Sequence, residues 1–325
     1  MSNLETEPAE LECATTADAA PRLELLEPRD VPLGGPRAMQ VRRTLPQRAR
    51  SLIGAWCFVD HYGPDAVSAS GGMVVPPHPH TGLQTVSWLF TGEIEHRDSV
   101  GSHAMVRPGE INLMTAGSGI SHSEVSTPQT STLHGAQLWL ALPDSERHRA
   151  PHFEHFAPEP VRLADATIRV FIGTLVGSTS PVRVYSPLVG AQIELPAGST
   201  IELPVDADFE HGILLDTGSV AVDGEDVPRS TLAYRSPGAS TIRISAGDAG
   251  ARLLLVGGAP FGERIVMWWN FIGRTHDEIV EYRRAWQAEV IDGSDADGRF
   301  GTVRGYLGSA LPPPGLPNVR LRPRD

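Results

Sequence analysis

Short apolar runs separated by glycine- and proline-containing turns limit the folds that this chain can adopt. From Leu23 onward, runs of strand length such as 85–90 and 134–140 are rich in branched and aromatic residues. Turn sequences such as Gly-Pro-Asp at 63–65 separate these runs. Many short strands with regular turns between them are typical of a β-sandwich or a β-barrel. The pattern therefore predicts an all-β protein.

The length of 325 residues exceeds what one hydrophobic core usually organises, so we expect two domains. Residues 143–151 are polar and bounded by prolines, and the β pattern resumes after them. We place the domain junction in this segment. The chain is then divided into a disordered acidic tail at residues 1–20, an N-terminal metal-binding barrel at 21–150 and a C-terminal degenerate barrel at 151–325.

One helix is expected near the end of the chain. Thr275 and Glu278 form a capping box, in which the threonine hydroxyl accepts a hydrogen bond from the Glu278 amide. Apolar residues then recur at helical spacing, at Ile279, Tyr282, Trp286 and Val290. We expect this short C-terminal helix to pack on the outside of a barrel.

The composition excludes several classes of protein. All 27 basic residues are arginine, so the chain has no lysine for a Schiff base, for pyridoxal phosphate or for a P-loop. The net charge is −12 and no basic cluster is present, which argues against direct binding of nucleic acid. The two cysteines form no CxxC pair, which excludes a thiolate zinc site. Since the chain has neither a signal-peptide pattern nor an apolar run long enough for a bilayer, we expect a cytoplasmic protein without membrane contact.

Two pairs of metal-ligand residues lie in the first half of the chain. His78 and His80 are two residues apart, and so are His122 and Glu124. Residues i and i+2 of an extended strand point to the same face, so each pair can aim at one point. Three imidazoles and one carboxylate suit a divalent ion such as Fe, Ni, Mn, Cu or Zn, and on a six-coordinate ion they leave two positions open. We predict a single metal centre at these four residues, beside a strand edge or bulge because Pro79 cannot donate a ladder hydrogen bond.

The sequence around these pairs resembles the two cupin motifs and, more closely, the pirin family. The usual cupin glutamate position holds Gln84, whereas Glu124 matches the ligand glutamate of pirins. The resemblance covers most of residues 53–125 and is weaker in the C-terminal half, with motifs at 60–61, 78–80, 92–99, 107–109 and 114–124. It implies a bicupin fold of two cupin-type β-barrels, with the metal in the first barrel. Thr81 and Gln84 differ from the residues common in pirins, and we expect them to alter the pocket rim.

The resemblance also implies an activity. Similarity to pirins suggests a dioxygenase that acts on a flavonol-like aromatic substrate with O2. Quercetin is the reference substrate for this activity. The metal expected from the family is Fe(II), with Ni, Mn, Cu or Zn as alternatives. Glu124 is then the candidate catalytic base for the flavonol hydroxyl. The alternative is a non-catalytic metal-binding regulator that binds transcription factors or metabolic enzymes, and in either case a monomer is our default expectation.

The remaining histidines carry weaker predictions. A loose cluster near the junction, which we interpret as solvated loop residues rather than a second metal site, consists of His148, His152 and His155. His134 begins an apolar strand and is expected to be a hydrogen-bonded barrel histidine, and His61 is expected to have a structural role. The second half contains no His-x-His pair, and His211 stands alone. The C-terminal barrel is therefore predicted to bind no metal.

Overall fold

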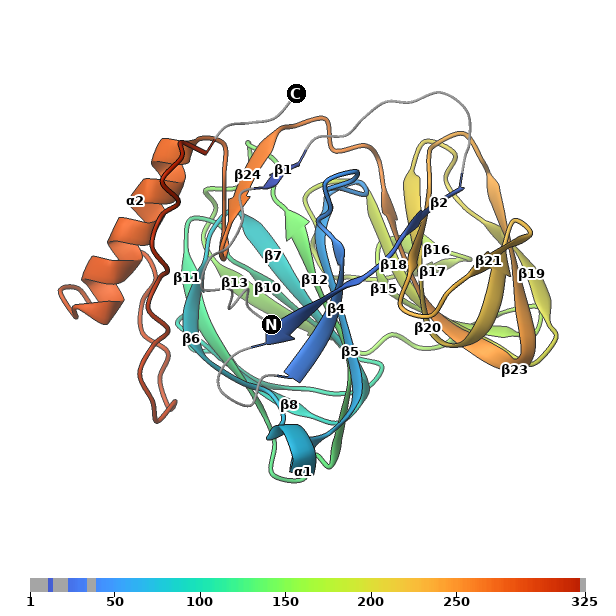
Figure 1. Cartoon of the computed structure of the whole chain (residues 1–325), viewed down its shortest axis with the longest axis horizontal. Coiled ribbons are helices and arrows are strands. Elements are labelled where there is room, and N and C mark those ends of the chain that lie inside the picture. The colour runs from blue at the N-terminus through green and yellow to red at the C-terminus, as the bar shows by residue number, and fades with distance from the viewer. Residues whose placement is uncertain (1–10, 14–22, 34–38, 322–325) are drawn as a thin grey trace.

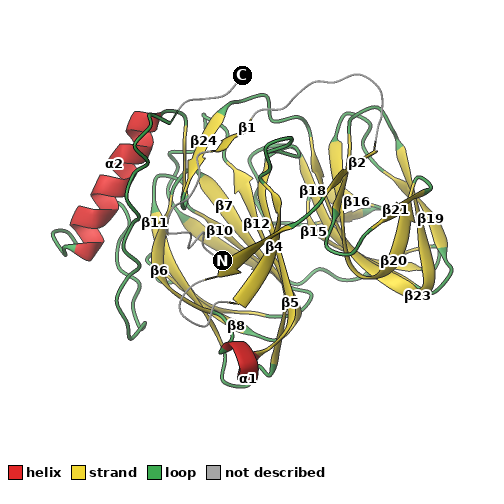
Figure 2. Ribbon diagram, in the orientation of Figure 1, coloured by secondary structure: helices red, strands yellow, loops and turns green. Residues whose placement is uncertain are grey.

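The computed structural model describes residues 11–13, 23–33 and 39–321. Two β-barrels lie side by side, and the helix α2 (His276–Trp286) covers the outer side of the first barrel (Figure 1). Figure 2 shows that strands make up nearly all of the regular structure. The predicted all-β fold of two barrels with one short C-terminal helix is confirmed. Among the described residues, no helix is both long and apolar enough to cross a membrane.

The first barrel is built from two antiparallel sheets. The seven-stranded sheet has the order β13-β10-β7-β12-β5-β4-β3, with bounds β3 (Arg29–Leu33), β4 (Met39–Leu45), β5 (Trp56–Ala66), β7 (Leu83–Thr91), β10 (Ile111–Thr115), β12 (Thr132–Ala141) and β13 (His152–Phe156). The four-stranded sheet has the order β6-β11-β8-β9, with bounds β6 (Val74–His80), β8 (Ile94–Asp98), β9 (His103–Val106) and β11 (Ile120–Ser126). One turn of helix, α1 (Val67–Ser70), connects β5 to β6.

The second barrel contains a nine-stranded sheet. Its main path is β14-β15-β18-β23-β20-β22-β2, with β19 beside β23 and β21 beside β20. The bounds are β2 (Leu23–Leu26), β14 (Val161–Leu163), β15 (Ala166–Ile172), β18 (Leu188–Leu195), β19 (Thr200–Pro204), β20 (Glu210–Val222), β21 (Glu225–Val227), β22 (Leu232–Arg235) and β23 (Thr241–Gly258). A small hairpin joins β16 (Thr174–Leu175) to β17 (Ser178–Thr179). Buried aliphatic side chains such as Ile168, Ile193 and Leu253 form the hydrophobic core of this barrel.

Strands from each half of the chain contribute to the other half. β13 follows the predicted junction but pairs with β10 of the first barrel, and β2 precedes it but pairs with β22 of the second. The predicted disordered tail lies outside the described residues except for β1 (Leu11–Cys13), which pairs with β24 (Ile265–Trp268). These crossings tie the two barrels together.

The C-terminal helix begins as its sequence predicts. The Thr275 hydroxyl accepts a hydrogen bond from the Glu278 amide at 3.2 Å. One face of α2 is buried in a cluster with β24 and β25 (Phe271–Gly273), and its buried residues are Ile279, Tyr282 and Trp286. A π-helix, η1 (Gln287–Ile291), continues from α2.

After η1 the chain returns across the first barrel. The Leu311 amide donates to the Pro77 carbonyl at 2.8 Å, and the Ser121 hydroxyl donates to the Phe300 carbonyl at 2.9 Å. Pro77 lies on β6 and Ser121 on β11. The C-terminal segment therefore covers the two strands that carry the predicted metal ligands.

Candidate metal centre

The four predicted ligands lie on two neighbouring strands. β6 carries His78 and His80, and β11 carries His122 and Glu124. The strands are antiparallel, with His122 opposite His78 and a register shift between His122 and Glu124. β6 is also the edge strand of its sheet, as expected from Pro79, whereas the register shift lies between His78 and Val75 rather than at Pro79. All four side chains are buried and at most 1% exposed.

The Nε2 atoms of the three histidines converge inside the first barrel. Nε2 of His80 lies 3.2 Å from Nε2 of His78 and 3.1 Å from Nε2 of His122. Burial lowers the pKa of His78 to about 3. Burial and the neighbouring histidines hold the pKa values of His80 and His122 well below the usual value. All three imidazoles are therefore neutral, which is the state that binds a divalent metal.

The opposite ring nitrogens of the first two histidines face backbone carbonyls. Nδ1 of His78 donates to the Pro76 carbonyl at 2.8 Å, and Nδ1 of His80 donates to the Asn270 carbonyl at 3.1 Å. Because a carbonyl oxygen only accepts, the proton of each ring is on Nδ1. Nε2 then has a free lone pair directed into the barrel. The donor set fits a single divalent ion held by imidazole Nε2 atoms.

A close contact between the two halves of the chain positions the end of β6. The Ile272 amide donates to the Thr81 carbonyl at 3.0 Å, directly after His80. Gly82 has a φ of +68°, and a Cβ at this position would overlap the Ile272 carbonyl oxygen. The glycine therefore permits the approach that brings Asn270 to His80.

Glu124 lies beside the histidines. A carboxylate oxygen of Glu124 and ring nitrogens of His122 and His96 all lie within 4.8 Å of one another. The Ser87 hydroxyl of β7 donates to Oε1 of Glu124 at 3.0 Å and lies 2.9 Å from Oε1 of Gln137 on β12. These contacts from two further strands hold the carboxylate inside the barrel.

Aromatic residues form part of the surroundings. Trp139 stacks on Phe58 with ring centroids 4.1 Å apart, and its ring meets the ring of His80 edge-on at 5.1 Å. Burial, and then the charge of Glu124, raises the pKa of Tyr62 well above its usual value. The Tyr62 hydroxyl and the Trp139 indole N–H are buried, and neither has a hydrogen-bond partner among the described residues. Buried polar groups of this kind mark places where a water or a ligand is expected.

A second buried cluster joins the two barrels. Oδ1 of Asp216 in the second barrel lies 2.8 Å from Nε2 of His61 and 2.6 Å from Nε2 of His134. Oδ2 of Asp216 accepts from Nε of Arg252 at 2.5 Å. Two imidazoles and a carboxylate are possible metal ligands, but the guanidinium occupies the second carboxylate oxygen and its positive charge opposes a cation. We interpret this cluster as a structural network, in agreement with the role expected for His61.

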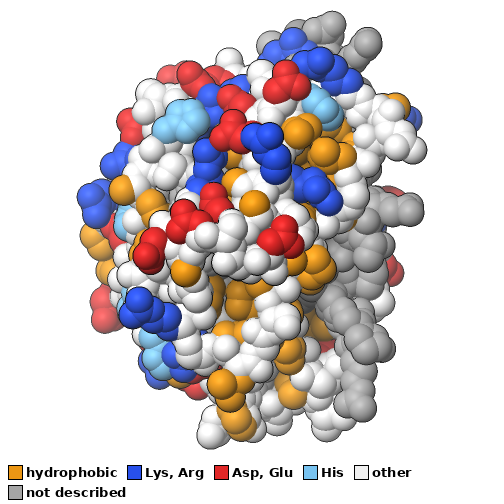
Figure 3. Space-filling model, turned by 90° about the vertical axis from the view of Figure 1, so that its left-hand side faces the viewer, with side chains coloured by type: hydrophobic (Ala, Val, Ile, Leu, Met, Phe, Trp, Pro, Cys, Tyr) orange, Lys and Arg blue, Asp and Glu red, His pale blue; other side chains and the backbone are white. Residues whose placement is uncertain are grey.

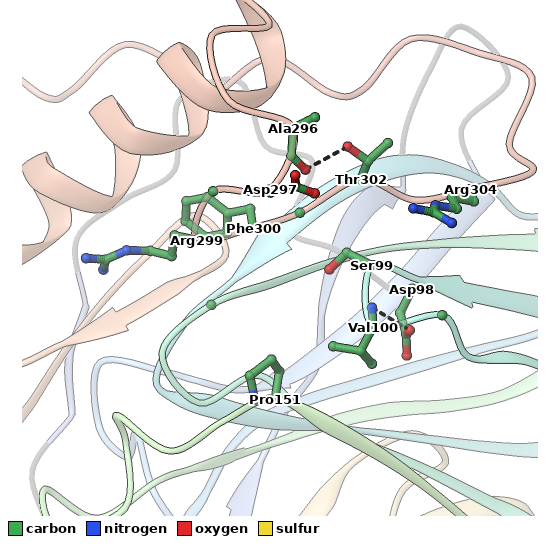
Figure 4. A pocket seen from close by; sticks show the side chains of 14 residues that line it. Asp98, Ser99, Val100, Pro151, Ala296, Asp297, Arg299, Phe300, Thr302 and Arg304 are labelled. Carbon is green, nitrogen blue, oxygen red and sulfur yellow. Dashed lines mark hydrogen bonds between the residues drawn. The ribbon is translucent and has the colours of Figure 1, made fainter.

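A cavity of about 650 Å³ lies at the end of the first barrel where β6 ends and β11 begins. One wall of the cavity is formed by the loop at residues 98–101, together with Gly119 and Pro151. The other wall is formed by residues 296–302 and Arg304 of the C-terminal segment. Figure 4 shows Asp98, Ser99 and Val100 on the other side of the opening from that segment, with the Asp98 carboxylate turned toward the Val100 amide. On the side of the molecule that carries α2, acidic and basic side chains are interspersed (Figure 3).

Two histidines of the predicted junction cluster lie apart from this centre. His152 and His155 are on β13 rather than in a loop, where they contact Glu154 at 3.3 Å and Glu110 at 3.4 Å. They were expected in a loop because the prolines around them suggested one, and they belong instead to the edge of the first sheet. Gln84 is buried and donates to the Arg183 carbonyl at 2.9 Å.

Sequence reasoning missed three residues around the centre. His96, Asn270 and Ser87 each contact a predicted ligand. Only His96 had a usable signal, because His96 and Asp98 form a third pair at i and i+2 on a strand. The Asn270 contact is made by a backbone carbonyl, which no side-chain pattern predicts.

The comparisons with known proteins agree with this architecture. The family model of pirin matches residues 38–140, and that of the pirin C-terminal cupin domain matches residues 190–292. A Pseudomonas aeruginosa protein named "Putative quercetin 2,3-dioxygenase" is 43% identical over 297 residues, which cover 91% of each chain. A "Pirin-like protein" of Caulobacter vibrioides is 37% identical over 268 residues, 79% of this chain and 91% of the relative.

Solved structures of related proteins are similar to this one. The crystal structure of a quercetin 2,3-dioxygenase from Acinetobacter baumannii has a TM-score of 0.85 and 37% identity, and the match covers 92% of this chain and 98% of that chain. The Escherichia coli pirin YhhW, solved in complex with nickel(II), shares the fold with a TM-score of 0.58, 20% identity and coverage of 74% and 100%.

Two β-barrels with a buried histidine and carboxylate centre in the first define a bicupin protein with a candidate metal site in that barrel. The matches to both domains show further that the chain belongs to the pirin family. The relatives named as quercetin 2,3-dioxygenases favour an oxidoreductase.

Proposed function

We propose that this protein is a metal-dependent dioxygenase that cleaves a flavonol-like aromatic substrate with O2. The observation that carries the proposal is the convergence of three neutral histidines, in which Nε2 of His80 lies 3.1–3.2 Å from the Nε2 atoms of the other two, with a buried carboxylate beside them. The names of the relatives from Pseudomonas aeruginosa and Acinetobacter baumannii support the reaction class.

The proposed ligands are His78, His80, His122 and Glu124. An ion bound to them supplies Lewis acidity, which lowers the pKa of a bound aromatic hydroxyl. We propose Fe(II) as the physiological ion, with Ni, Mn, Cu and Zn as alternatives that the same donors accept. Metal analysis of freshly purified protein tests this assignment.

Glu124 is the proposed catalytic base. It is 1% exposed and accepts a hydrogen bond from Ser87 at 3.0 Å, so its carboxylate has a fixed orientation and little competition from water. In the proposed reaction it takes the proton of the flavonol 3-hydroxyl. The heterocyclic ring then opens, both atoms of O2 enter the depside product, and one carbon of the ring leaves as carbon monoxide.

The buried surroundings suit a planar aromatic substrate. Trp139 and Phe58 present stacked rings next to His80, and Tyr62 has a buried hydroxyl without a protein partner among the described residues. Apolar walls with a few polar groups are typical of small-molecule sites. We propose that the substrate binds on this side of the three histidines.

An oxygen-dependence assay tests the proposed function. Protein loaded with each of the five ions is mixed with quercetin in air and under anaerobic conditions, and the flavonol absorbance is followed. We expect loss of absorbance in air only, abolished by His122→Ala. The matched control is His103→Ala, an exposed histidine of β9 that contacts Glu95. Absence of oxygen-dependent loss with every ion would reject the dioxygenase and favour a regulatory metal-binding protein.

A further inference from the structure

His122 differs from the other two histidines in what holds its ring. Nδ1 of His78 and Nδ1 of His80 face backbone carbonyls, whereas Nδ1 of His122 lies 3.4 Å from Nδ1 of a second histidine, His96. His96 is 2% exposed and comes from β8, the strand on the other side of β11 from β6. Its contact with His122 is therefore buried.

The contacts continue from His96 to a carboxylate. Nε2 of His96 lies 3.3 Å from Oδ2 of Asp98, and Oδ1 of Asp98 accepts from the backbone amides of Val100 at 3.1 Å and Ser102 at 2.8 Å. A carboxylate that accepts two backbone amides has a fixed position. The 98–102 turn thus holds Asp98, and Asp98 holds His96.

The proton positions along this chain of contacts are mutually consistent. Nε2 of His122 faces the other histidines, so its proton is on Nδ1 and is donated to Nδ1 of His96. His96 then has its own proton on Nε2 and donates it to Asp98, which can only accept. Each ring nitrogen of His122 and His96 is then either a donor or an acceptor, and both imidazoles are neutral.

The neighbouring structure restricts the His96 ring. It stacks on Phe153 of β13, with centroids 4.8 Å apart and an angle of 28° between the rings. The strand register places His96 opposite Glu124 and Asp98 opposite His122. Both residues are therefore fixed relative to β11 by the sheet itself.

We infer that His96 and Asp98 are positioning residues for the ligand His122, and that they link the proposed metal centre to the cavity at the barrel mouth. This inference rests on the proposed centre. Asp98 is the shared element, because it ends the chain of contacts from His122 and also lines the cavity of about 650 Å³ (Figure 4). Outer contacts of this kind orient a ligating imidazole and raise its basicity.

A role for His96 as a ligand of the same ion fits the geometry less well. Nδ1 of His96 faces Nδ1 of His122. On the His122 ring, Nδ1 lies on the opposite side from Nε2, which is the atom that points to the other two histidines. An ion bound by His96 would therefore be a second ion, held with His122 and Glu124. Metal stoichiometry distinguishes the two arrangements.

The test compares His96→Leu, His96→Asn and the control His103→Leu. Leucine removes the acceptor for Nδ1 of His122, while asparagine places its Oδ1 near the position of the lost Nδ1 and can accept the same proton. The readouts are the metal-to-protein ratio, the rate of nickel loss to a chelator, and the visible absorption spectrum of the cobalt-substituted protein. Circular dichroism melts confirm that each variant is folded.

We expect nickel loss from His96→Leu to be 10–100-fold faster than from the wild type, at an unchanged ratio of one ion per chain. His96→Asn should restore most of the retention, and His103→Leu should match the wild type. Asp98→Asn gives an independent check, since its amide group cannot accept from both the loop amides and His96, and it should also accelerate loss.

Three results would overturn the inference. The first is that folded His96→Leu and Asp98→Asn lose nickel at rates within twofold of the wild type. The second is that His96→Leu and His96→Asn lose nickel at the same rate. The third is that the metal-to-protein ratio is two ions per chain in the wild type and falls to one in His96→Leu. Failure of the wild type to bind any metal would instead refute the proposed centre itself.

Discussion

Replacing Asp216 with asparagine tests the polar network that joins the two barrels. Asp216 is 0% exposed, and its Oδ1 lies 2.8 Å from Nε2 of His61 and 2.6 Å from Nε2 of His134. Its Oδ2 accepts from Arg252 at 2.5 Å. Asparagine keeps the shape of the side chain but replaces one acceptor with an NH2 donor. That donor then faces either the guanidinium or the imidazole N–H groups.

The size of the effect follows from burial. Removing one partner from a buried charged network costs about 3–5 kcal/mol. Asparagine retains one acceptor oxygen and Arg252 is 25% exposed, so solvent replaces part of that contact. We therefore expect the lower end, about 3 kcal/mol of unfolding free energy, which is roughly a hundredfold change in the folding equilibrium.

Urea titration followed by far-UV circular dichroism measures this cost. The matched control is Asp226→Asn, an exposed aspartate on β21 of the same barrel, which should change the free energy by about 0.5 kcal/mol or less. If Asp216→Asn were no more costly than this control, the buried network would not stabilise the barrel contact and the argument would fail.

The same network predicts how the cost depends on pH. Burial by itself would raise the pKa of Asp216, but the contacts with His134 and His61 outweigh it and hold that pKa well below its usual range. The stabilisation is therefore complete above the unfolded pKa of about 3.9 and is lost as the pH falls through the lower folded value. Burial lowers the pKa of His61, so its share is lost as the pH falls below about 6.5, where the unfolded histidine takes up a proton. The difference between wild type and Asp216→Asn should therefore persist from pH 7 down to about pH 4 and shrink only below that, where the unfolded aspartate is protonated.

Three further substitutions have defined outcomes. Glu124→Gln should lower kcat for quercetin by about 10²-fold or more, because the base is lost. Stopped-flow absorbance at matched metal content measures this, and an unchanged kcat would remove Glu124 from the mechanism. Arg43→Met removes a buried ion pair in which the guanidinium contacts Asp60 at 2.7 and 2.9 Å. The free energy of unfolding in a urea titration should fall by about 3–5 kcal/mol, because the Asp60 carboxylate stays buried without this partner. A decrease below about 1 kcal/mol would contradict this reasoning. Gly82→Ala places a Cβ against the Ile272 carbonyl and should lower both the melting temperature and the metal content. Normal metal content would show that the contact between Gly82 and Ile272 of β25 is not needed to hold His80.

Local patterns predicted the fold and the inner donors of the centre. The two-residue repeat of a strand places His78 with His80 and His122 with Glu124, and the antiparallel register then brings His122 opposite His78. The capping box at Thr275 predicted where α2 begins for the same reason, since the interaction spans three residues. Such features depend on neighbours along the chain, so a single sequence contains them.

The outer contacts of the site depend on tertiary structure instead. The carbonyl that holds His80 belongs to Asn270, 190 residues away, and His61 meets Asp216 across 155 residues and two barrels. No periodicity connects such positions, and the Asn270 contact uses a backbone atom that is identical in every residue type. The structural role expected for His61 stays a prediction, and the sequence did not identify Asp216 as its partner.

These long-range contacts give the C-terminal half a role at a centre whose proposed ligands all come from the first barrel. The C-terminal half supplies the carbonyl at His80, the hydrogen bond from Ser121 to Phe300 beside His122, and one wall of the cavity at Asp98. The second barrel has an aliphatic interior, so its contribution to the site is made through its edges and the segment that follows it. Separating the two halves should therefore remove the support of His80 and His122 even though both residues remain in the first barrel. A bicupin chain whose proposed centre lies in the first barrel can retain its second barrel for this physical reason.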